Sequence, residues 1–68
     1  MKTNFTNTDV ATVQLPLREV LIINNALNEV CNGIHLEGEF DTRIGCSVDE
    51  ARRLLGAVSK LLEEMERP

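Results

Sequence analysis

The sequence predicts a mainly α-helical fold: a helical hairpin with a short linking helical turn and room for one short N-terminal strand. Apolar residues recur at spacings of three and four over residues 48–65, as in an amphipathic helix. Residues 16–32 form a second long run that is apolar around much of its circumference. Glycines and a serine mark the helix ends at Gly33, Gly45 and Ser47.

Length and composition indicate one small globular domain. The chain has 68 residues, of which 43% are apolar and 26% charged, and Phe5 and Phe40 are its aromatic residues. We therefore expect an aliphatic core, a flexible arm at residues 1–9 and a single small helical domain at residues 10–68. Domains of this size have marginal cores, and oligomerisation is a common remedy.

Net charge and the cysteine pattern limit which partners and which cellular compartment we expect for this protein. The net charge is −4 and the pI is about 4.8, which disfavours nucleic acid and anionic membrane surfaces as partners. No apolar run reaches the length of a signal peptide or a membrane span. Cys31 and Cys46 follow neither a C-x-x-C nor a disulfide-dense pattern, so we expect free thiols in a cytoplasmic protein.

The N-terminal part divides at about residue 10. Residues 1–9 are rich in Thr and Asn and offer nothing to bury, which is typical of a flexible arm. Ala11, Val13 and Leu15 then alternate with polar residues, which fits a short strand or an extended segment lying on the core. A strand of this length needs a partner.

The first helix is expected to start at Pro16 and to end near Asn32. Proline suits the first turn of a helix, and Gly33 would supply the left-handed residue after its last turn, with Ile34 folding back over it. Because its apolar residues surround much of the helix, we expect burial on more than one side.

Asparagines form a row on this helix. Asn24, Asn28 and Asn32 follow a spacing of four and so lie on one face, although Asn is a poor helix former. Either the row is a solvated face, or its amides satisfy loop backbone or a partner across an interface. We further expect Glu29 and Arg43 to form a partly shielded ion pair where the linking turn folds back on the helix.

The middle segment allows two structures. Ile34, Leu36, Phe40 and Ile44 fall on even positions, which is the period of a strand, and Glu37-Gly38 could form a hairpin turn. Leu36, Phe40 and Ile44 also follow the helical spacing of four. We favour a short helix over Glu39–Ile44, because Gly45 suits its C-terminal end and a new helix begins directly afterwards.

The last helix is the clearest element. Ser47 is its expected N-cap, and Glu50 three residues later completes a capping box, which explains the stretch "RIGCSVDEARRLL" locally. Its apolar stripe is expected to form the interface of a twofold homodimer, because two helices alone leave apolar residues facing water. The interface residues are Val48, Ala51, Leu55, Val58, Leu62 and Met65.

A helix-turn-helix is the alternative interpretation of the same stretch. In such units the position four residues before the turn glycine is a small apolar residue, whereas this chain has Asp41 there. Asp49 and Glu50 would stand at the leading end of the recognition helix, where phosphates approach. DNA binding is therefore the second hypothesis, and a small antitoxin or immunity-type inhibitor with a basic partner is the third.

Catalysis and cofactor binding are disfavoured. Cys31, His35 and Cys46 match none of the common zinc spacings, and no nucleophile is accompanied by a recognisable base or a phosphate-binding loop. We expect no enzyme, no cofactor and no metal site.

Two motifs carry a resemblance. The stretches "IINNALNEVCNGI" and "EFDTRIGCSVDEARRLL" resemble a group of small bacterial proteins in which an N-N-A-L-N-E-V-C-N-G helix precedes an F-x-T-R-x-G turn and a terminal helix. The resemblance covers residues 15–62, with Pro16 replacing a Ser or Thr cap, and implies no settled activity. We expect a non-catalytic interaction or regulatory module with a polar cluster of Asn24, Asn28, Glu29, Asn32 and Arg43, whose partners are itself and an unidentified protein.

Overall fold

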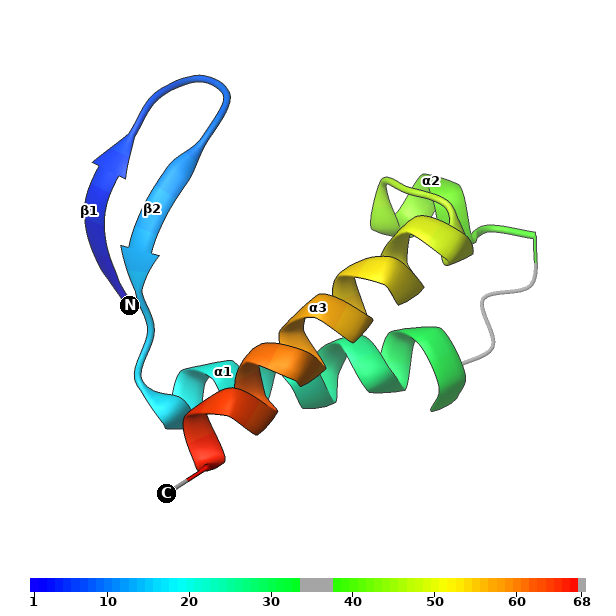
Figure 1. Cartoon of the computed structure of the whole chain (residues 1–68). Helices are drawn as coiled ribbons and strands as arrows, with labels where there is room; N and C mark the ends of the chain where they lie inside the picture. The colour runs from blue at the N-terminus through cyan, green and yellow to red at the C-terminus, as the bar shows by residue number, and fades with distance from the viewer. Residues whose placement is uncertain (34–37, 68) are drawn as a thin grey trace.

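Two antiparallel helices form the body of the molecule, and a β-hairpin extends from one end of the pair (Figure 1). The computed structural model describes residues 1–33 and 38–67. In chain order the elements are β1 (Lys2–Thr6), β2 (Ala11–Gln14), α1 (Leu17–Asn28), the π-helical segment η1 (Glu29–Gly33), α2 (Phe40–Ile44) and α3 (Val48–Glu66). The predicted class, a helical hairpin with a short helical link and an N-terminal strand, is confirmed.

Helix α1 begins one residue later than the sequence indicated. Pro16 is the N-cap, with an extended backbone (ψ 156°), and its carbonyl accepts hydrogen bonds from the N–H groups of Glu19 and Val20. Proline can occupy this position because the first N–H groups of a helix have no intrahelical partner.

The end of the first helix differs from the prediction. The backbone N–H of Glu29 donates to the carbonyls of both Asn25 and Ala26, and from Glu29 the chain continues as the wider π-helical segment η1. Gly33 is the last residue of η1 and does not have a positive φ, so it is not the left-handed cap that we expected. Gly33 still belongs to the π-helical segment, so the chain does not leave the helix in the left-handed conformation at this residue. The predicted fold-back of Ile34 lies outside the described residues.

The link and the start of α3 follow the sequence closely. Helix α2 covers Phe40–Ile44 and ends at Gly45, whose φ of 89° lies in the left-handed region that favours glycine. Ser47 caps α3, and its Oγ accepts a hydrogen bond of 3.1 Å from the Glu50 N–H. Helix α2 confirms the prediction of a helix rather than a hairpin for residues 40–44.

The core of the described residues is small and lies between α1, η1 and α3. Its buried side chains are Val20, Cys31, Ala51 and Leu62, and Val20 is 1% exposed. Burial on more than one side of the first helix was therefore the wrong expectation for a single chain. Leu17, Leu21 and Ile22 all stay exposed, because α3 covers one face of α1 and no other element of the described residues covers the remaining faces.

The segment predicted as an arm, residues 1–9, contains a β-strand that the sequence pattern did not indicate. Residues Lys2–Thr6 form β1, which pairs antiparallel with β2 around a bulge between Thr3 and Phe5. Asn7 fixes the turn: its Oδ1 accepts hydrogen bonds of 2.7 Å from the N–H groups of Asp9 and Val10, and its own N–H donates to the Val10 carbonyl. Backbone pairing and this side-chain turn replace the missing apolar pattern.

The hairpin diverges from the helical pair and has no covered face of its own (Figure 1). Every residue of β1 is exposed, and in β2 only Val13 is partly covered. Its foot is tied to α1 by an ion pair between the N-terminal ammonium of Met1 and the Glu19 carboxylate. No helix within residues 1–33 and 38–67 combines the length and apolarity needed to cross a bilayer.

Candidate interaction surface

One polar contact links the two long helices. Asn24, the first member of the asparagine row, is half-buried, and its Oδ1 accepts a hydrogen bond of 2.6 Å from the Ser59 Oγ on α3. The sequence pointed to Asn24 but not to Ser59, because the register of α1 against α3 decides which residue lies opposite. This bond fixes that register and marks one side of the helical pair.

The rest of the predicted polar cluster does not converge. Asn28 and Asn32 are exposed and bond to each other, with the Asn32 Nδ2 donating to the Asn28 Oδ1 at 3.0 Å. The ion pair that we expected between Glu29 and Arg43 is absent from the described part of the chain. The Glu29 carboxylate instead lies over Gly33, where a Cβ would come within 3.1 Å of the Glu29 Cδ.

The predicted interface stripe on α3 is largely used within the chain. Ala51 and Leu62 are buried, and Val48, Leu55 and Val58 are half-buried; Met65 alone is exposed. Because α1 covers this stripe, the stripe is not the free surface that we assigned to a second copy. The apolar residues available to a partner lie beside it.

Several of the exposed apolar residues share one side of the helical pair, whereas Leu17 and Leu21 lie towards the side of Asn24 and Ser59. Successive residues of an α-helix are about 100° apart around its axis. Asn24 and Ser59 lie to one side of the buried core residues, and their contact defines one flank of the helical pair. Residues on the other side of the core residues define the opposite flank. On that opposite side α1 presents Ile23 and Ala26, and α3 presents Leu54, Leu61 and Met65. We call this set the apolar flank; Leu54 is 55% exposed and Leu61 43%.

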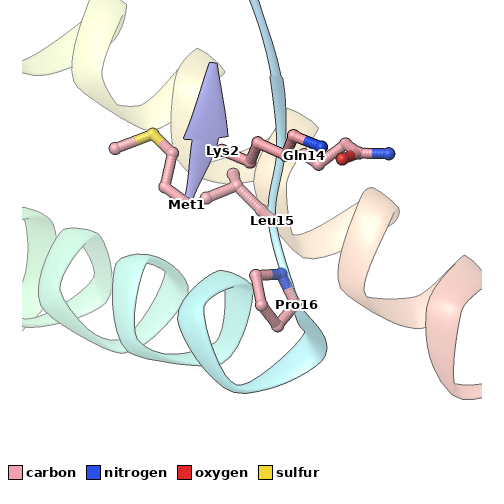
Figure 2. Close-up of a pocket in the computed structure, with 5 residues that line it drawn as sticks. All are labelled: Met1, Lys2, Gln14, Leu15 and Pro16. Atoms are coloured by element: carbon pink, nitrogen blue, oxygen red, sulfur yellow. The ribbon is translucent and has the colours of Figure 1, made fainter. Parts of the chain in front are cut away.

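The hairpin foot lies on the same side as the apolar flank. Glu19, which holds the N-terminal ammonium, precedes Ile23 by four residues and so lies on the same face of α1. Beside it is an open hollow of about 430 Å³ lined by Met1, Lys2, Gln14, Leu15 and Pro16 (Figure 2). The residues that line it carry two ammonium groups, from Lys2 and from the N-terminus at Met1, one amide and apolar atoms.

The described residues offer little for catalysis or metal binding. No group of three or more His, Cys, Asp or Glu side chains within them could hold a metal ion. Cys31 and Cys46 are free thiols, and Cys31 is buried. The Ser59 hydroxyl donates to an amide oxygen, which cannot act as a base towards it.

The segment from α2 to α3 has the turn of a helix-turn-helix but not its chemistry. Gly45 turns the chain between a short helix and a long one, as in DNA-binding units. Asp41 is exposed, not packed between the helices, and Asp49 and Glu50 occupy the first turn of α3 in solvent. An approaching phosphate would meet these carboxylates first.

Comparison with known proteins adds no relative. No family model matches the chain, no curated protein is significantly similar to it, and no solved structure matches its fold. The resemblance carried by the two sequence motifs therefore stays a prediction, and function rests on the chain's own residues.

Proposed function

We propose that this protein is a non-catalytic protein–protein interaction module of the cytoplasm, and that the apolar flank is its binding surface. The observation that carries the proposal is the exposure of large aliphatic side chains on one side of the helical pair. Leu54 and Leu61 are seven residues apart, about two helical turns, and both face solvent there. Contiguous exposed apolar surface of this kind typically marks an interaction site.

The total exposed area supports the same conclusion. The chain exposes 5468 Å². A compact monomer of its mass is expected to expose about 4,300 Å² from the scaling of surface with size. The difference, about 1,200 Å², is larger than the roughly 800 Å² that each partner buries in a standard interface.

The shape explains where this excess comes from. The radius of gyration is 13.5 Å, whereas a compact domain of this length has a value of about 11 Å. The hairpin is exposed on both faces and the apolar flank is open, so both regions gain from a protein partner. Nucleic acid is a less favourable partner than a protein, because carboxylates occupy the first turn of α3. If the protein retained random duplex DNA at low salt, DNA binding would become the preferred hypothesis.

In-cell crosslinking tests the proposal. A photoreactive residue at Ala57, beside Leu54 and Leu61, should form protein adducts of discrete mass. The same residue at Arg52, on the opposite flank of α3, is the matched control and should form none. Leu61→Glu should abolish the adducts made from position 57. If no adduct forms, or if both positions react equally, the apolar flank is not an interaction surface.

A further inference from the structure

We infer that the partner of the apolar flank is a second copy of this chain, packed with its α3 antiparallel to the first about a twofold axis near Ala57. This inference rests on the proposed function and adds the identity of the partner and the geometry. Three features of α3 carry it: the spacing of its exposed leucines, the placement of two charges and the small residue between them.

The leucines and Ala57 make the flank complementary to itself. In an antiparallel pair centred between Ala57 and Val58, Leu54 lies opposite Leu61 of the second copy, and the symmetry repeats the contact. Ala57 lies at the crossing point, where a small side chain lets two helices approach closely. An isologous interface requires this kind of self-matching surface.

Two charges beside the leucines match in the same arrangement. Arg53 and Glu64 are eleven residues apart, about three turns, so they lie on the same outer edge of α3. Both are exposed, and neither forms an ion pair with another described residue. In the antiparallel pair each Arg53 faces Glu64 of the second copy, with an offset of about 3 Å along the axis. In a parallel pair this edge of one helix would lie on the far side from the same edge of its partner, so Arg53 and Glu64 could not pair.

The small core favours a permanent partner. Four side chains are buried among the described residues, and the hairpin has no covered face. A second copy is present wherever the chain is made. The area that the chain exposes beyond a compact monomer of its mass, about 1,200 Å², is within the range that each subunit of a homodimer buries. The hairpin foot lies on the same side and extends that surface towards the second copy.

Charge reversal tests this geometry. Arg53→Glu alone and Glu64→Arg alone should each weaken self-association by about tenfold or more, because each creates two like-charge contacts. An equimolar mixture of the two variants should form a one-to-one dimer as tight as the wild type, since both contacts then join opposite charges. Native mass spectrometry distinguishes this mixed dimer from the two single species.

A matched pair of variants controls for net charge. Arg52→Glu and Glu66→Arg change the charge by the same amounts on the opposite flank of α3 and should affect neither association nor mixing. If the control pair behaves like the test pair, or if mixing restores nothing, the inference is wrong. Preferential pairing of Arg53→Glu with the wild type would show that position 53 faces its own copy and would also overturn it.

One outcome separates this inference from the proposed function. A purified monomer, together with crosslinked adducts from position 57 that contain only a different protein, would overturn self-association and leave the interaction module standing. Adducts that contain two copies of this chain support both. Circular dichroism of each variant establishes that lost association is not lost folding.

Discussion

The helical pair and the N-terminal hairpin are stabilised by different interactions. The helices bury Val20, Ala51 and Leu62 between them and are linked by the bond between Asn24 and Ser59. The hairpin buries none of its residues and is held by backbone pairing and one side-chain turn. Isolated two-stranded hairpins are marginal in water. The helical pair therefore has a core of its own, whereas the shorter hairpin depends on what covers it.

The largest expected effect comes from the core of the helical pair. Val20→Asp should abolish the cooperative unfolding transition. An unpaired carboxylate at a site that is 1% exposed costs several kcal/mol, which is comparable to the total free energy of unfolding of a domain of this size. Circular dichroism during heating measures it. Ile22→Asp is the matched control on the same helix: Ile22 is 53% exposed, so the transition should survive. Equal loss in both variants would mean that α1 is covered on both sides in solution.

The next effect concerns the link between the helices. Ser59→Ala and Asn24→Ala should each lower the free energy of unfolding by about 1 kcal/mol, since each removes the same hydrogen bond between the two helices. The double variant should cost less than the sum of the two, and denaturant titrations provide the double-mutant cycle. Additive losses would show that the two side chains do not interact.

A smaller and local effect is expected in the hairpin. Asn7→Ala removes the side-chain acceptor of the turn and should destabilise the hairpin by about 1 kcal/mol. Amide hydrogen exchange should accelerate in β1 and β2 and stay unchanged in α1 and α3. Thr8→Ala in the same loop is the control and should change neither region. Faster exchange throughout the chain would contradict the independence of the two regions.

The smallest effect concerns the tie between the two regions. Glu19→Gln removes the ion pair with the N-terminal ammonium, whose partners are 58% and 36% exposed. Surface pairs contribute at most about 1 kcal/mol, so global stability should fall by less than that. Nuclear Overhauser contacts between Met1 and α1 should weaken while those within the hairpin persist. A change within the hairpin itself would show that the tie also sets its internal structure.

The sequence was most informative where local rules decide the structure. The period of apolar residues and the Ser47 cap predicted α3, and Gly45 predicted the end of α2. These signals depend on neighbours along the chain and need no knowledge of tertiary contacts. The prediction of a left-handed cap at Gly33 was wrong, because the helical segment η1 continues to that residue.

The remainder required three-dimensional information. The hairpin has no apolar alternation in β1, and its signal was the short "TNTD" stretch, in which Asn7 can cap its own turn. The apolar stripe on α3 was read as an interface, whereas α1 covers most of it. Only the register set by Asn24 and Ser59 separates the residues that face α1 from Leu54 and Leu61, which face solvent.

The mass of the native chain in solution tests the central claim most directly. Light scattering coupled to gel filtration, with circular dichroism on the same fractions, gives mass and folding together. We expect a folded species of twice the 7.6 kDa chain mass, and Leu61→Glu should reduce its mass and its thermal stability together. A fully folded species with the mass of one chain, equally stable with and without Leu61→Glu, would contradict it.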